Sequence, residues 1–421
     1  MSVSQALVAG PSLGPAPAAR RPLDERLVHL TALLVVGLAP VEGYLLDLGG
    51  QLAKVPTVLF VLAWAASRVR QRSRPRLHGV HVLVAALAAV VLVSTAVHLR
   101  EPYAVEYAIR WLPFLALAAL LVDVAGRDVP VRHLLAAAVV GACAAGFGAV
   151  YSVLVLGEAR ASGPLEDPND LACVLVAALP LLVALTPGPG ARRLPAVARG
   201  TLLLLAAAVL VVGAGITFSR GGGFAAAAAV AVLLARRAVP ARAIGGVLAL
   251  VAVGAGMLLL VAPAQLDRAL DEKAYIAGTN IDTRELRWQA AARMLAGDPL
   301  LGVGPGGFRS EYAEASHVAE LVEQTPVAHS MYLEVGAELG LPGLLLFLGV
   351  VASGFVASER ALRLGADRRV VAAVQASLVA VVVASIFLSE QYYLPLWSLV
   401  AVACGLELSQ RQQGRARGRS R

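Results

Sequence analysis

The sequence predicts an all-α, polytopic membrane protein of about twelve transmembrane helices, with one large extracytoplasmic loop that contains short helices. Hydrophobic residues make up 58% of the chain and charged residues only 15%, whereas soluble domains are about 45–50% apolar. Apolar runs of about 20 residues, the length that a membrane-spanning helix needs, recur along the chain. A single long polar segment, residues 263–329, interrupts these runs.

The polar segment and the apolar runs divide the chain into five parts. Residues 1–26 lack the apolar core and cleavage site of a signal peptide, so we expect a disordered cytoplasmic tail there. Spans one to nine are expected within 27–262, and the large loop is 263–329. Spans ten to twelve are expected within 330–408, and a basic cytoplasmic tail occupies 409–421.

Each predicted span is a largely apolar run between polar or basic connectors. The spans are expected near residues 28–46, 52–68, 79–97, 106–123, 134–156, 169–187, 201–217, 222–236, 244–262, 330–356, 370–388 and 393–408. The tenth contains Gly340, Pro342 and Gly343, which predict a broken or tilted helix.

The placement of lysine and arginine predicts the orientation of these spans. Basic residues concentrate in the cytoplasmic connectors of membrane proteins. With the N-terminus inside, about 25 of the 36 lysines and arginines lie in the inside connectors and the two tails. Both termini are therefore expected in the cytoplasm, and the segment 263–329 on the extracytoplasmic side.

An arginine follows the seventh predicted span, in the run Phe218-Ser219-Arg220-Gly221-Gly222-Gly223. A charged side chain at the membrane edge is costly unless it is paired or reaches water. The run is either a tight turn from which Arg220 reaches water, or an anion contact beside the free N–H groups of the next span. Spacing alone leaves both interpretations open.

The large polar segment contains a predicted helix that begins near Thr283. Asp282 and Glu285 have the spacing of a capping box, and apolar residues then recur at helical spacing. This apolar face consists of Leu286, Ala290, Ala291, Met294 and Leu295. Arg284 and Arg287 are neighbours near the positive end of the helix dipole, where two guanidinium groups suit a diphosphate. The alternative is a solvated face whose arginines pair with Asp282 and Glu285.

His329 stands where the polar segment meets the tenth predicted span. A histidine at a partly desolvated junction can be neutral near pH 7 and act as a base. The alternative is a helix-cap or interfacial histidine.

Several acidic residues near predicted span ends have two interpretations each. Asp167 is expected to cap the sixth span, with Pro168 at its first position and Asn169 next to it; a metal site is the alternative. Glu334 and Glu338 lie in the tenth span, where they either serve function or neutralise buried arginines.

Further motifs complete the pattern. Arg284 begins an Arg-x-x-x-Trp motif, and a glycine-rich run extends from Asp298 to Phe308. The run follows a helical pattern and no strand, which argues against a nucleotide-binding loop and for a backbone turn. A His-Ser-x-x-Leu-Glu motif begins at His329, and Gly-Leu-Pro-Gly follows at 340–343. With the Ser-Arg-Gly-Gly turn at 219–222, these motifs resemble the O-antigen ligase and O-antigen polymerase family over about residues 165–345.

The resemblance implies a GT-C-like glycosyltransferase in the bacterial inner (cytoplasmic) membrane, with its active site on the extracytoplasmic or periplasmic side. Its donor would be a glycan on polyprenyl diphosphate, such as undecaprenyl diphosphate. Its acceptor would be a glycan, a lipid or a protein. The resemblance implies no metal, and neither a cofactor nor a nucleic-acid partner is expected.

The resemblance also assigns residues by motif. Arg220 and Arg284 match the family's arginines, and His329 matches its loop histidine, the expected general base. Helix spacing adds Arg287 to the expected diphosphate-binding groups. The expected supporting residues are Asn169, Glu334 and Glu338. Direct attack by the acceptor hydroxyl would invert the anomeric carbon.

A ligase and a polymerase share the donor site and the base, so the sequence does not separate them. A transporter or flippase is the alternative from another class. It would place its polar groups near the membrane midplane, and the clustered arginines and histidine of one outer segment argue against it. The chain also lacks a convincing internal repeat, which weakens an inverted-repeat transporter.

Overall fold

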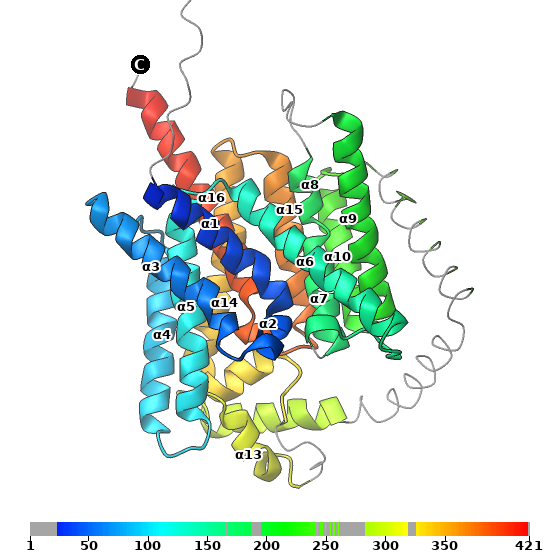
Figure 1. Ribbon diagram of the computed structural model, residues 1–421. Coiled ribbons are helices and arrows are strands. Elements are labelled where there is room, and N and C mark those ends of the chain that lie inside the picture. Colours follow the sequence, from blue (N-terminus) through cyan, green and yellow to red (C-terminus); the bar gives the residue numbers. More distant parts are fainter. Residues whose placement is uncertain are drawn as a thin grey trace, which may run out of the picture.

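The computed structural model consists of helices joined by connectors in the residues that it describes (Figure 1). These are residues 23–165, 167–186, 195–240, 283–318 and 326–419, with scattered positions between 242 and 260. No strand occurs within these ranges. The all-α prediction is therefore confirmed for the described part of the chain.

The helices follow the predicted spans closely. They are α1 (Leu23–Leu38), η1 (Ala39–Val41), α2 (Glu42–Leu48), η2 (Leu52–Lys54), α3 (Val55–Arg70), α4 (Val80–Val97), α5 (Ala104–Ala125), α6 (Val131–Leu154), η3 (Gly163–Leu165), α7 (Pro168–Ala178), α8 (Leu181–Leu185), α9 (Ala196–Ile216), α10 (Arg220–Ala235), α13 (Gly307–Ala315), α14 (Met331–Arg363), α15 (Arg368–Ala384), η4 (Glu390–Tyr392) and α16 (Leu394–Arg419). Residues 283–297 are also helical, which agrees with the helix predicted from Thr283.

Eight helical stretches of the described chain are long and apolar enough to cross a membrane. They coincide with predicted spans one to seven and with the tenth. Helices α10, α15 and α16 occupy the places of spans eight, eleven and twelve. The ninth predicted span, 244–262, lies largely outside the described residues, so the count of twelve stays a prediction.

Helices α15 and α16 lie at the centre of the bundle. α16 contacts α5 and α14, whereas α15 contacts α7, α8 and α10. Trp111 of α5, Phe347 of α14 and Trp397 of α16 are fully buried. Their ring centroids lie 5.9–6.2 Å apart in edge-to-face contacts, a favoured geometry for aromatic pairs. These rings pack the middle of the bundle beneath the candidate site described below.

The basic connectors gather at one end of the bundle. Arg132 Nη2 lies 2.5 Å from Asp367 Oδ2, and His78 Nε2 lies 3.0 Å from Glu407 Oε2. The described part of the long polar segment lies at the opposite end, where α13 and the helix 283–297 cover the bundle (Figure 1). This separation agrees with the charge asymmetry used to predict the orientation.

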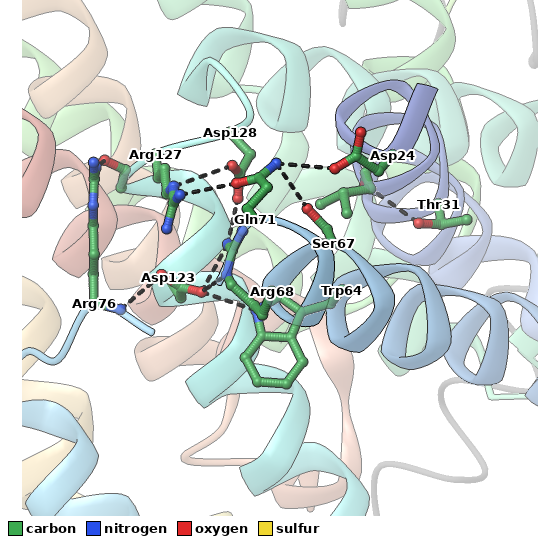
Figure 2. Close-up of polar contacts among 12 residues, drawn as sticks. Asp24, Thr31, Trp64, Ser67, Arg68, Gln71, Arg76, Asp123, Arg127 and Asp128 are labelled. Atoms are coloured by element: carbon green, nitrogen blue, oxygen red, sulfur yellow. Dashed lines mark hydrogen bonds and ion pairs between the residues drawn. The ribbon is translucent and has the colours of Figure 1, made fainter. Parts of the chain in front are cut away.

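A buried ion cluster fixes α3 to α5 at the basic end (Figure 2). The Arg68 guanidinium lies 2.8 Å from Asp123 and 2.5 Å from Asp128. Asp123 also accepts hydrogen bonds from Trp64 Nε1 and from the backbone N–H of Arg76, both at 2.8 Å. Buried charges need such partners because burial removes their hydration. The cluster therefore holds the connector after α3 against the end of α5.

An apolar cavity of about 1000 Å³ lies between α7, α8, α9, α10 and α15. Its lining reaches from Ser219, at the start of α10, to Pro240. The structure describes the chain continuously up to Pro240, shortly before the ninth predicted span. The cavity wall is thus continuous in sequence with that span.

We predict that the end carrying α13 faces the outside of the cell. Glu314 is exposed in α13, and Arg74 is exposed in the connector between α3 and α4. A membrane-impermeant maleimide should label Glu314→Cys in intact cells, and Arg74→Cys only after permeabilisation, in a background without native cysteines. The reverse pattern would refute the orientation.

We predict that Arg68→Leu lowers the free energy of unfolding by about 3–5 kcal/mol, because it leaves two buried aspartates without their partner. Arg110 and Glu106 form an exposed pair whose side chains are 50% and 54% accessible. Arg110→Gln is the matched control and should cost less than about 1 kcal/mol. Denaturant unfolding in detergent measures both, and equal effects would contradict the assignment.

Candidate functional site

The candidate site lies at the end of the bundle opposite the basic connectors (Figure 1). The starts of α7, α10 and α14 meet this end, together with η4 and the outer end of α5. The helix 283–297 and α13 lie over it. All the predicted site residues lie in these elements or next to them.

A break in α14 shapes the site. Gly340 has φ 67° and ψ −174°, which interrupts the helix, and Pro342 has no N–H to donate to the carbonyl of Glu338. The N–H of Leu341 instead donates to Pro299 O at 2.8 Å. The predicted break in the tenth span is therefore confirmed.

The break lets the glycine-rich loop bind the backbone of α14. Val303 N–H donates to Ala337 O at 2.9 Å, and Gly304 N–H donates to Glu338 O at 3.1 Å. Gly302 has φ 64°, and an added Cβ would lie 2.4 Å from Ala337 O. The backbone-turn interpretation of this loop is confirmed, and the turn docks on α14.

Two buried glutamates share one arginine beside this contact. Glu334 and Glu338 are one helical turn apart on α14, and both are fully buried. Arg309 Nη1 lies 3.3 Å from a carboxylate oxygen of each, and its guanidinium lies 4.2 Å from the centroid of the Tyr107 ring. Burial alone would lower the pKa of Arg309, but the two carboxylates outweigh it and hold the pKa above its ordinary value. The glutamates thus neutralise a buried arginine, one of the two roles expected for them.

The connector between α15 and α16 completes this cluster. Ser389 Oγ donates to Glu334 at 2.5 Å, and Gln391 Nε2 donates to it at 2.9 Å. Tyr392 OH donates to Glu338 at 3.2 Å. Trp397, one of the three buried rings at the centre of the bundle, donates its Nε1–H to Gln391 O at 3.0 Å and so holds η4 in place. We call Arg309, Glu334, Glu338 and their partners Tyr107, Ser389, Gln391 and Tyr392 the Arg309 network.

His329 has an uncommon backbone conformation beside this network. Its φ is 47°, the left-handed region that residues with a Cβ adopt at a cost of about 1–3 kcal/mol. On one side, Ala328 N–H donates to Glu334 Oε2 at 3.1 Å. On the other side, Met331 N–H lies within hydrogen-bonding distance of Ser385 O and Leu388 O, at 3.0 and 2.7 Å. The left-handed residue is therefore held from both flanks.

Arg287 lies close to the same loop. It is only 2% exposed, and its Nη1 lies 3.4 Å from Val327 O, two residues before His329. The guanidinium lies 5.9 Å from the centroid of the Tyr312 ring. Glu285 accepts a hydrogen bond from Gln289 Nε2 at 3.1 Å, and Asp282 lies outside the described residues. The solvated-face alternative is therefore wrong for Arg287.

Arg284 belongs to a cationic group over the start of α7. Burial lowers the pKa of Arg284, and the like charges of Arg287 and Arg160 lower it further. The carboxylate of Asp167 acts in the opposite direction. Arg160 Nη2 donates to Asn169 Oδ1 at 3.3 Å, so the predicted Asn169 lies in this group. Arg284 therefore lies within electrostatic range of two further arginines and of Asp167.

Asp167 has the capping role expected from the sequence. Its side chain accepts the N–H of Asn169 at 2.6 Å, and Pro168 is the first residue of α7. Within the described ranges, no three His, Cys, Asp or Glu side chains are grouped so that they could hold a metal ion.

Arg220 begins α10 and is exposed. Ser219 caps this helix by accepting the N–H of Gly222 at 3.2 Å, so the tight-turn interpretation holds for the backbone. A Cβ on Gly221 would lie 3.6 Å from Phe387, whose ring lies 6.4 Å from that of Trp288. This contact places the start of α10 beside the helix that carries Arg284 and Arg287.

Sequence reasoning missed several residues of the site. Arg309, Tyr107, Gln391 and Tyr392 carry no local signal, because their partners lie far away in the sequence. Arg160 did have one: it is an arginine in a connector assigned to the outside, against the charge asymmetry of the other connectors.

The segment from α9 to the break in α14 includes Arg220, Arg284, Arg309, His329 and Glu334. Residues 202–348 match the family model described as O-Antigen ligase. This segment, about a third of the chain, is similar to an O-antigen ligase domain. The match confirms the resemblance to the O-antigen ligase family, and no curated protein matches the chain. The domain and the apolar helices fit a multi-pass protein of the inner membrane that acts in polysaccharide biosynthesis.

We predict that Gly302→Ala separates the glycine-rich loop from α14. The added Cβ meets backbone atoms at 2.4 Å and requires φ 64°, which together should cost more than about 2 kcal/mol. Gly297→Ala is the control, since a Cβ there meets nothing within 4 Å. Unfolding measurements in detergent compare the two, and equal stabilities would contradict the docking.

Proposed function

We propose that the protein is an inverting, metal-independent glycosyltransferase that moves a glycan from a polyprenyl-diphosphate carrier to an acceptor hydroxyl on the outer face of the membrane. The family match supports an enzyme of the O-antigen ligase or polymerase kind. The observation that carries the proposal is the left-handed backbone of His329. Arg287 contacts the loop that carries this histidine, and Arg284 lies one helical turn from Arg287. Strained residues of this kind cluster at functional sites.

The arginines supply the charge that a diphosphate needs. The charges of Arg160 and Arg287 and the carboxylate of Asp167 act on Arg284. Guanidinium groups bind phosphate oxygens in pairs, and their charge stabilises a departing diphosphate. Arg220, at the start of α10, would contact the same group from the membrane side. We propose Arg284, Arg287 and Arg220 as the donor-binding residues.

His329 would activate the acceptor. The acceptor oxygen forms a bond to the anomeric carbon while the bond from that carbon to the diphosphate oxygen breaks. The hydroxyl proton passes to a ring nitrogen of His329, and polyprenyl diphosphate leaves. A positioned general base typically contributes about 100- to 10,000-fold, and attack opposite the leaving group inverts the anomeric carbon.

The transporter alternative fits the arrangement less well. The charged groups named here lie at the ends of α7, α10 and α14, under the helix 283–297 and α13. A transporter requires its binding groups near the midplane, open to alternate sides. A polymerase of the same family remains the second candidate, because it would use the same donor site with another acceptor.

We predict that His329→Ala and Arg284→Ala strongly impair transfer in cells. In a strain that lacks the protein, polyprenyl-diphosphate-linked glycan should accumulate. Wild type should clear it, whereas the variants should lower clearance at least about 100-fold, because each removes a group that acts in the transition state.

Arg293→Ala is the matched control for this experiment. Arg293 lies on the same helix as Arg284, is exposed, and donates to Ala315 O at 2.7 Å, so clearance should stay at the wild-type level. Full clearance by stably expressed His329→Ala would refute the proposed base. The length of the accumulated glycan separates the candidates: complete chains indicate a ligase, and single repeat units indicate a polymerase.

A further inference from the structure

The loop that carries His329 depends on one carboxylate for its conformation. Glu334 receives four donors: the Ala328 N–H, Ser389 Oγ, Gln391 Nε2 and Arg309 Nη1. The Ala328 N–H belongs to the residue directly before His329, and Ala328 is fully buried. A buried N–H without an acceptor costs about 1–3 kcal/mol. The position of the Glu334 carboxylate therefore sets the backbone on this flank of His329.

Arg309 controls the charge of that carboxylate. A single nitrogen, Nη1, lies 3.3 Å from both Glu334 and Glu338. Without Arg309, two carboxylates one turn apart would share a buried site with no cation between them. Like charges in such a site repel, so one carboxylate must move or take up a proton. Either change alters the group that accepts the Ala328 N–H.

The other flank of His329 contacts backbone carbonyls and not the Glu334 carboxylate itself. Met331 N–H contacts backbone carbonyls of the connector after α15, and Trp397 holds Gln391 through its indole N–H. Loss of Arg309 should therefore release the Ala328 side of the loop while the Met331 side stays in place. The local effect can be distinguished from a general loss of folding.

We propose that Arg309 is a positioning residue for His329. It acts through Glu334 and Glu338, and it does so by charge, not by contact with the substrate. Its guanidinium is already occupied by two carboxylates and lies over the Tyr107 ring. The inference rests on the proposed function insofar as His329 is the base. The position of the loop, however, can be measured without turnover.

The experiment compares Arg309→Gln, Arg309→Lys and the control Arg110→Gln in the purified full-length protein. Arg110 lies over the same ring, 4.4 Å from its centroid, but it pairs with the exposed Glu106 and lies outside the Arg309 network. Hydrogen–deuterium exchange of the peptides covering 326–334 reports the Ala328 amide. Polyprenyl-diphosphate-linked glycan extracted from the deletion strain is the donor for steady-state kinetics.

Arg309→Gln should exchange the Ala328 amide at least about tenfold faster, because the hydrogen bond that protects it is weakened. Its kcat should fall at least about tenfold, as part of the contribution of the base is lost, while the donor KM stays within about twofold. Arg309→Lys keeps a cation between the carboxylates, so it should restore most of the slow exchange at Ala328 and most of the wild-type kcat. Arg110→Gln should match wild type in both measurements.

A double variant keeps the test decisive if Arg309→Gln folds poorly. Arg309→Gln with Glu338→Gln removes the second carboxylate, so it should restore slow exchange at Ala328 relative to Arg309→Gln alone. No recovery in the double variant would overturn the charge-balance argument. A rise in donor KM, or lost activity with unchanged exchange, would instead place Arg309 against the substrate and overturn the positioning role.

The two proposals fail separately. If wild type does not turn over the lipid-linked glycan, the proposed function fails, while the exchange measurements still test Arg309. If wild type turns it over and exchange at Ala328 is unchanged by Arg309→Gln, only the positioning role is refuted.

Discussion

Two carboxylates buried on one face of a membrane helix require a counter-charge, and this requirement organises the outer end of the protein. Glu334 and Glu338 on α14 receive it from Arg309, which belongs to the outer segment and not to the bundle. For Arg309 to reach them, the glycine-rich loop must lie against α14. The break at Gly340 makes this possible, because it leaves backbone carbonyls of α14 available to the loop. Local chain breaks and buried charge therefore act together to fix the outer segment on the membrane helices.

The same network joins parts of the chain that are distant in sequence. The segment that matches the O-antigen ligase model supplies Arg309, His329 and the two glutamates. Tyr107 comes from α5, and Ser389, Gln391 and Tyr392 come from the connector before α16. The segment's central cluster is thus incomplete without helices on both sides of it. The buried rings of Trp111, Phe347 and Trp397 support this cluster from below.

The sequence predicted the features that depend on neighbouring residues. The cap at Asp167, the turn at Ser219, the apolar face after Thr283 and the break at Gly340 all follow from local rules and are confirmed. The Arg309 network was not predictable in this way, since its pairs are joined only by the fold: Glu334 and Gln391, for example, belong to different helical elements. The burial of Arg287 was also missed, because helical spacing shows that it is beside Arg284 but not that α13 covers it.

The two groups of arginine differ in a way that bears on their roles. Arg309 lies between two carboxylates, so its charge is balanced inside the protein and little remains to attract an anion. Around Arg284, by contrast, burial and the like charges of Arg287 and Arg160 lower the pKa of Arg284, and the carboxylate of Asp167 opposes this. Burial of like charges is unfavourable unless something offsets it. An anionic donor such as a diphosphate would supply that offset, which makes the Arg284 group suited to binding and the Arg309 group suited to positioning. In the proposed function, the charge that binds the donor and the charge that holds the base thus belong to separate groups, and each can be altered without removing the other.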